Sequence, residues 1–297
     1  MELALHSITY AGYFYEGGAL SPEEIIDRAA QHGYDAVELM AKRPICSPFD
    51  FDTSRAEKLR SYAADRRIGL TCIAGYIDLP RSNAVDREKE LVFARETFRL
   101  AADLGAPSVR VYAGGDVIHE GATGWEQWEW CVEGVRELVP LAEQLGLDIV
   151  LEWHTGVVQS TPALMDMVEH IGSDIVKVML DPPHLSFRGE DPAEAVQLVG
   201  DRLAVGHIAD FERGSPMITY DAVPELTTLQ SVPMNHVPLG EGMVENEAFI
   251  EACKAEGLDP TISFEVCTPF HISHRMPTLA NVDELVAQAA RYLRPML

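Results

Sequence analysis

Four short apolar runs in the second half of the chain each break at an acid or a histidine. The runs read IVLEWH, KVMLDPPH, AVGHIAD and TISFEVC, and their polar residues include Glu152, Asp181, His207 and Glu265. An ionised side chain in such a place is costly unless something neutralises it. Three carboxylates and one imidazole form an oxygen-rich ligand set. We therefore expect one divalent metal ion, with Mn²⁺ favoured over Mg²⁺, Co²⁺ and Zn²⁺.

Taken singly, each of these residues has an ordinary structural explanation. A glutamate at a strand end often caps the strand or forms a salt bridge, and a histidine in an apolar strand is usually a hydrogen-bonded core residue. Four such residues on four successive apolar runs are better explained by a shared site.

Short apolar runs alternate with longer helical patterns along the whole chain. The candidate strands lie at residues 3–8, 36–40, 70–76, 108–114, 148–154, 176–181, 203–210 and 261–266. The helical segment SPEEIIDRAAQHG opens with a serine cap and ends at a glycine. Strands that read as continuous apolar runs are typical of a parallel sheet that is covered on both faces.

Eight strand–helix units predict one (β/α)₈ TIM-barrel domain over residues 1–297. An open, doubly wound sheet fits less well, because no GxGxxG motif follows the first strand. An extended connection, residues 211–244, follows the seventh strand and is expected to be an irregular binding loop or lid. TIM-barrel enzymes place their catalytic groups at the carboxyl ends of the strands, and the four candidate ligands lie at such ends.

Two further residues follow the first candidate ligand. His154 comes two residues after Glu152 and would face the same side of the strand, so we expect it to bind the substrate or to act as an acid or base. Trp153 is a candidate to stack on a ring of the substrate, although ordinary rim packing is the more common explanation of such a residue.

The charge balance restricts the class of partner. The chain has 23 Lys and Arg against 47 Asp and Glu, which gives a net charge of −24. An acidic surface repels phosphate backbones and anionic lipids, and no apolar stretch is long enough to span a bilayer. We therefore expect a small-molecule substrate, no nucleic acid and no membrane, although an acidic surface also simply favours solubility.

Cysteine usage and the N-terminus indicate a cytoplasmic protein. The five cysteines are odd in number and show no CxxC spacing, which favours free thiols over a disulfide framework. The first residues, MELALHSITY, read as a strand without the basic segment or cleavage site of a signal peptide.

Several motifs together resemble the xylose isomerase-like TIM-barrel superfamily, which includes sugar isomerases, sugar epimerases and endonuclease IV. AVELM resembles the family's second strand and LGAPSVRVYAGG its fourth. LEWH, DPPH, HIAD and SFEV resemble the four metal-ligand strands, and VPLGEGMV the segment before the last helix. The resemblance covers nearly the whole chain. It implies that Glu152, Asp181, His207 and Glu265 bind the metal, and that the protein forms a homo-oligomer.

The resemblance also implies substrate contacts. Ketose 3-epimerases of this family carry a histidine and an arginine that match His184 and Arg213, and both would contact substrate oxygens. A solvated surface arginine is an equally good explanation of Arg213. The sequence departs from these epimerases after Glu152, where a proline is usual, and this departure argues against a simple free ketohexose.

The activity implied by the resemblance is a metal-dependent isomerase or epimerase of a sugar or sugar-like keto substrate. The reaction would pass through a metal-bound enediolate, with Glu152 and Glu265 removing and returning the proton and His184 polarising an oxygen. The same intermediate precedes loss of water or of an aglycone. A lyase or dehydratase acting on an inosose or a 3-keto-glycoside is therefore the alternative.

Two other classes of function have less support. A DNA-repair endonuclease of this superfamily would need extra histidine ligands at the ends of early strands, and the runs at 70–76 and 108–114 end without one. A non-catalytic binding protein on a decayed barrel would be expected to have lost ligands, whereas all four are present.

Overall fold

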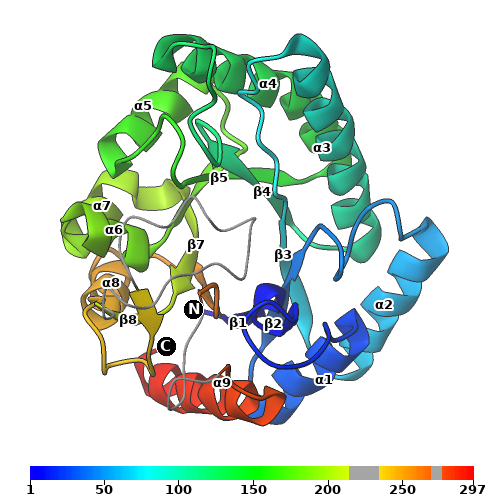
Figure 1. Ribbon diagram of the computed structural model, residues 1–297, viewed down its shortest axis with the longest axis vertical. Helices are drawn as coiled ribbons and strands as arrows, with labels where there is room; N and C mark the ends of the chain where they lie inside the picture. Colours follow the sequence, from blue (N-terminus) through cyan, green and yellow to red (C-terminus); the bar gives the residue numbers. More distant parts are fainter. Residues whose placement is uncertain (214–233, 269–275) are drawn as a thin grey trace.

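The computed structural model describes residues 1–213, 234–268 and 276–297. Eight parallel strands close into a barrel in the order β1-β10-β7-β6-β5-β4-β3-β2 (Figure 1). The barrel strands are β1 (Leu3–His6), β2 (Ala36–Met40), β3 (Gly69–Ala74), β4 (Ser108–Ala113), β5 (Asp148–Trp153), β6 (Val176–Leu180), β7 (Leu203–Ile208) and β10 (Thr261–Phe264). The predicted (β/α)₈ barrel is confirmed, and no predicted strand end differs from the observed one by more than two residues.

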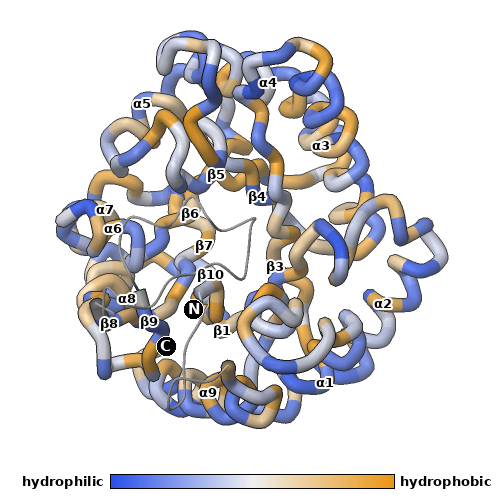
Figure 2. The backbone as a smooth tube through the Cα atoms, viewed as in Figure 1, coloured by the Kyte–Doolittle hydropathy of each residue, from blue (hydrophilic) through white to orange (hydrophobic). Residues whose placement is uncertain are grey.

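A ring of helices covers the outside of the barrel (Figure 1). The helices are α1 (Pro22–His32), α2 (Thr53–Asp65), α3 (Ala84–Leu104), α4 (Gly124–Leu145), α5 (Thr161–Ile171), α6 (Pro182–Arg188), α7 (Pro192–Val199), α8 (Asn246–Ala255) and α9 (Leu279–Leu293). Short 3-10 turns are η1 (Ser7–Tyr10), η2 (Gly200–Arg202) and η4 (Arg294–Met296). Hydrophobic residues are frequent on the strands and alternate with hydrophilic ones along the helices (Figure 2). Within the described ranges, no helix combines the length and apolar character needed to cross a membrane.

Local sequence signals set the helix ends. Ser21 Oγ accepts a hydrogen bond from the Glu24 N–H at 3.2 Å, and the Glu24 carboxylate accepts one from the Ser21 N–H at 2.8 Å, so α1 opens with a capping box. The same helix ends at Gly33, whose φ of 82° is readily adopted by a residue without a Cβ. Thr123 and Glu126 form an equivalent capping box at the start of α4. These signals place the strand–helix boundaries where the sequence predicts them.

A small apolar layer, which we call the plug, fills the barrel interior. Cys72, Val150, Met179 and Val205 form a buried cluster separate from the main core and come from β3, β5, β6 and β7. Side chains two residues further along a strand point to the same side. Positions 152, 181 and 207 therefore lie above the plug, toward the carboxyl ends of the strands.

The connection after β7 differs from the single irregular loop predicted for residues 211–244. Two segments of it form short strands, β8 (Phe211–Arg213) and β9 (Met234–His236), which pair antiparallel. The prediction is therefore wrong for these two segments. Their backbone groups are satisfied by pairing between distant residues, and such pairing cannot be predicted from a polar, proline-containing sequence. Residues 214–233 lie outside the described part of the chain.

Asp210 anchors the end of this connection to the barrel. Its buried carboxylate accepts hydrogen bonds from the backbone N–H groups of Phe211, Gly240, Gly242 and Val244 at 2.9–3.0 Å. A Cβ atom at Gly242 would lie 2.1 Å from Asp210 Oδ1, so only glycine allows this approach. The VPLGEGMV motif is thus folded around one carboxylate.

The substitution Asp210→Asn tests this anchor. It replaces one acceptor oxygen with an NH₂ group that faces backbone donors. We expect unfolding free energy to fall by about 2–3 kcal/mol, measured by urea denaturation. Asp201→Asn, a matched change at an exposed aspartate, should alter stability by less than about 0.5 kcal/mol. Equal stability of the two variants would contradict the anchoring role.

Candidate metal centre

The four predicted ligands converge at the carboxyl end of the barrel. Glu152 on β5 and His207 on β7 lie above the plug, while Asp181 and Glu265 directly follow β6 and β10. All four side chains are buried. One ligand atom from each of Glu152, Asp181 and His207 lies within 4.8 Å of the others, as does one from each of His6, His207 and Glu265.

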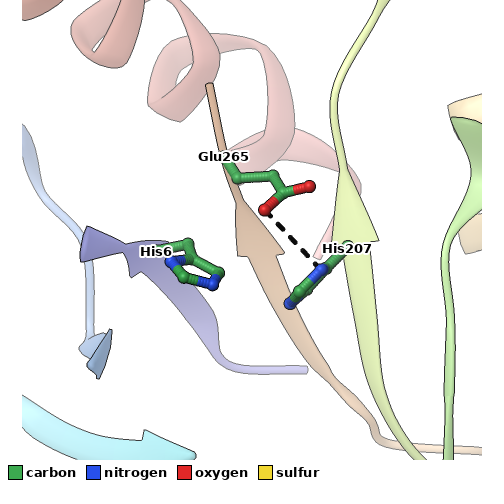
Figure 3. Close-up of side chains that lie close together, drawn as sticks. All are labelled: His6, His207 and Glu265. Atoms are coloured by element: carbon green, nitrogen blue, oxygen red, sulfur yellow. Dashed lines mark ion pairs between the residues drawn. The ribbon is translucent and has the colours of Figure 1, made fainter. Parts of the chain in front are cut away.

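His207 is the centre of this arrangement. Its Nδ1 atom lies 3.6 Å from Glu152 Oε1 and 3.7 Å from Glu265 Oε2. Figure 3 shows one ring nitrogen of His207, from β7, facing the Glu265 carboxylate, with the His6 ring of β1 across the gap from the His207 ring. The sequence predicted that these distant segments meet, and the structure brings the four side chains together.

Asp181 is held at the centre by its position at the N-terminus of helix α6. Pro182 and Pro183 open α6, and Asp181 is its N-cap in an extended conformation. The Asp181 carboxylate accepts a hydrogen bond from the His184 N–H at 3.4 Å, and its other oxygen lies 3.4 Å from His184 Nε2. The DPPH motif therefore fixes one candidate ligand and one rim histidine on the same corner.

The buried carboxylates make the centre electrostatically unfavourable without a cation. Burial and the charges of Glu265 and Glu152 raise the pKa of Asp181 well above its usual range. Burial lowers the pKa of His207, but Glu38 and Glu265 outweigh this effect and raise it to about 10. Among the residues that the structure describes, His207 Nδ1 has no hydrogen-bond partner. A divalent ion would offset the repulsion and bind this nitrogen, so the donor set fits such an ion.

Arg110 is a charged residue of the centre that the sequence analysis missed. It projects from β4, is buried, and its guanidinium lies 3.0 Å from Glu152 Oε2. The rings of Tyr76 and Tyr112 lie 4.7 and 4.9 Å from the guanidinium carbon. The signal was present, because an arginine interrupts the apolar run SVRVYAG in the same way that the acids interrupt later strands.

Glu38 and His6 were also missed. Glu38 on β2 is fully buried and accepts a hydrogen bond from His207 Nε2 at 3.0 Å. His6 Nε2 lies 3.8 Å from the other Glu38 oxygen. Burial raises the pKa of Glu38, but His207 and His6 outweigh this effect and hold it well below the usual range. The glutamate in AVELM met the criterion used for the ligands, but the sequence does not say which histidine it contacts.

The rim above the centre carries two more histidines. The predicted substrate residues His184 and His154 are 14% and 19% exposed, and their rings lie 4.7 Å apart. His154 Nδ1 forms an ion pair with Asp116 at 2.9 Å, and Tyr112 packs 5.3 Å from the same ring. Burial lowers the pKa of His154, but Asp116 raises it above its ordinary value. Burial and the neighbouring His154 lower the pKa of His184.

For the two other predicted substrate residues, Trp153 and Arg213, the described part of the structure gives no direct contact with the centre. Trp153 is 2% exposed and belongs to the outer core, with its ring 5.4 Å from that of His184. This position corresponds to the packing alternative, because Trp153 points to the opposite side of β5 from Glu152. Arg213 is the last residue of β8, and its side chain lies outside the part of the chain that the structure describes.

Comparison with known sequences identifies relatives of two kinds. D-psicose 3-epimerase from Enterocloster bolteae is 25% identical over 224 residues, which cover 70% of this chain and 71% of that protein. Inosose dehydratase from Geobacillus thermodenitrificans is 26% identical over 172 residues, which cover 57% of this chain and 54% of that protein. The match thus spans about half the length of the dehydratase. Both relatives are enzymes, in agreement with the predicted enzymatic role.

Solved structures and a family description cover more of the chain. A crystal structure of the IOLI protein with a zinc atom has a TM-score of 0.76 at 18% identity, over 100% of this chain and 98% of that one. D-psicose 3-epimerase in the presence of D-fructose has a TM-score of 0.73 at 17% identity, over 100% and 99%. These likenesses show the fold. The family described as xylose isomerase-like TIM barrel matches residues 26–296, and this protein therefore belongs to that family.

Proposed function

We propose that this protein is a divalent-metal-dependent isomerase or epimerase of a sugar-like keto substrate. The observation that carries the proposal is the convergence of three buried carboxylates on His207 at the carboxyl end of the barrel. Glu152, Asp181, His207 and Glu265 would hold the ion. When bound, the ion would supply a Lewis acid for the substrate carbonyl. The oxygen-rich donor set favours Mn²⁺.

Glu152 and Glu265 are the proposed proton carriers. In the closed sheet, β6 and β7 separate β5 from β10, so the two carboxylates approach the centre from different directions. Epimerisation requires that a proton leaves one face of a carbon and returns to the other. One glutamate would remove the proton next to the carbonyl, and the other would return a proton from the opposite side.

The rim histidines would hold the substrate. His184 and His154 lie side by side above the centre, and Asp116 orients His154 through its ion pair. Both rings can donate or accept hydrogen bonds with hydroxyl oxygens. Arg213 would contact a further substrate oxygen from β8, and Trp153 would support the His184 ring from behind.

A dehydratase is the second candidate function. Elimination begins with the same proton removal but also needs an acid that protonates the departing hydroxyl group. The His154–Asp116 pair at 2.9 Å is well suited to that role, and it specifically favours this alternative. Relatives of the two kinds match at similar identity, 25% for the epimerase and 26% for the dehydratase.

Substitution of the two proton carriers tests the proposed chemistry. We expect Glu152→Gln and Glu265→Gln each to lower turnover by about 10²–10⁴-fold, because an amide cannot accept the proton. Glu169→Gln, at an exposed position on α5, is the control and should retain full activity. Near-normal turnover by either active-site variant with metal bound would contradict the scheme of two carboxylates.

Metal removal should lower stability. Since only the folded protein assembles the donor set, an ion at a hundred times its dissociation constant adds about 2.7 kcal/mol to the unfolding free energy. We expect the unfolding free energy of the Mn²⁺-loaded protein to exceed that of a chelator-treated sample by this amount, and calorimetry to show tight Mn²⁺ binding. In Asp181→Asn we expect the stability gain to be lost. A chelator-treated protein as stable as the Mn²⁺-saturated one would contradict the metal centre.

The two candidate reactions differ in what happens in deuterated water. An epimerase incorporates deuterium at one carbon and yields a sugar of the same mass apart from the label. A dehydratase yields an unsaturated product with ultraviolet absorbance. We expect NMR screening of ketoses, inososes and 3-keto-glycosides with Mn²⁺ to show exchange at one carbon. Absence of exchange and of product with every compound would contradict both candidates.

A further inference from the structure

The two ring nitrogens of His207 face chemically different partners. Nε2 donates a hydrogen bond to Glu38 Oε2 at 3.0 Å, on the side of β2. Nδ1 faces Glu152 and Glu265 at 3.6 and 3.7 Å, on the side of the candidate metal centre. An imidazole that binds a metal ion through one nitrogen is neutral and keeps one proton, so a proton held on Nε2 leaves Nδ1 as the nitrogen that binds the ion.

Glu38 is itself held between two imidazoles. His6 Nδ1 accepts a hydrogen bond from the Ile8 N–H at 3.0 Å, so in the neutral ring the proton of His6 lies on Nε2. That atom is 3.8 Å from Glu38 Oε1, the oxygen that His207 does not use. Both Glu38 and His6 are fully buried, so bulk solvent does not reach either side chain. The carboxylate is therefore fixed by the His207 hydrogen bond on Oε2, while its contact with His6 on Oε1 is a longer electrostatic one, since neither Oε1 nor His6 Nε2 has a hydrogen-bond partner among the described residues.

We propose that Glu38 is a positioning residue that holds His207 in the tautomer presenting Nδ1 to the metal, with His6 as a longer electrostatic contact on the other oxygen of Glu38. The inference rests on the proposed function, because it assigns a role toward the same metal ion. Glu38 is assigned outside the ligand set, since its Oε2 atom is occupied by Nε2 on the opposite edge of the ring. A carboxylate that accepts from the distal nitrogen of a ligating histidine fixes the ring orientation and raises the basicity of the ligating nitrogen.

The test uses two substitutions that separate charge from hydrogen bonding. Glu38→Gln nearly keeps the shape and can still accept from Nε2, but removes the charge. Glu38→Met removes both. Loss of such a partner typically weakens metal binding about 10–100-fold. We therefore expect Zn²⁺ affinity, measured by chelator competition, to fall about 10-fold in the Gln variant and about 100-fold in the Met variant.

A control variant and a spectroscopic readout distinguish positioning from a general packing defect. Thr71→Val removes a side-chain hydrogen bond to Thr261 inside the same barrel, away from His207, and should leave Zn²⁺ affinity within twofold of wild type. The ¹⁵N shifts of the His207 ring in the Zn²⁺-loaded protein report the tautomer directly. We expect a metal-bound Nδ1 and a protonated Nε2 in wild type, and a loss of this pattern in Glu38→Met.

The outcomes separate this inference from the proposed function. If wild type binds Zn²⁺ and both Glu38 variants bind with unchanged affinity and unchanged ¹⁵N shifts, the positioning role is overturned and the metal centre stands. If wild type binds no divalent ion, the proposed function is overturned together with this inference. Should the Met variant not fold, the Gln variant still decides, because Zn²⁺ affinity that is unchanged after loss of the Glu38 charge contradicts the predicted tenfold fall.

Discussion

The repulsion among three buried carboxylates is the constraint on which the rest of this structure depends. Glu152, Asp181 and Glu265 meet around His207, where little water is available to screen their charges. Arg110 offsets part of this charge through its ion pair with Glu152. A divalent cation would neutralise the remainder. The charge pattern that is unfavourable without a cation is thus the property that would favour a divalent cation at this position.

The barrel backbone holds these charged groups close together despite their repulsion. Alternation along each strand sends every second side chain inward, and the plug fills the space below. The N-cap geometry of α6 holds Asp181, and the Asp210 carboxylate folds the 237–244 segment beside the barrel end. Rigid backbone positions the groups, so little free energy need be spent in ordering them when an ion or substrate binds.

The strands and the four candidate ligands could be predicted because their signals are local. An acid or imidazole in an apolar run is visible in one segment, and parallel strands bring such ends together. The partnership of Glu38 with His207 joins residues 169 positions apart, and it depends on how β2 and β7 face each other across the barrel. The outward direction of Trp153 follows from strand alternation, and it agrees with the packing explanation rather than with a stacking role. The pairing of residues 211–213 with residues 234–236 depends on long-range contacts and had no comparable local signal.

Anomalous X-ray scattering from a crystal grown with Mn²⁺ would test the central claim most directly. We predict one strong peak within about 2.0–2.6 Å of His207 Nδ1 and of an oxygen from each of Glu152, Asp181 and Glu265. Such a peak would show that the converging carboxylates form a metal centre. No peak at this position in a crystal saturated with Mn²⁺, or a peak on the Glu38 side of the His207 ring instead, would contradict it.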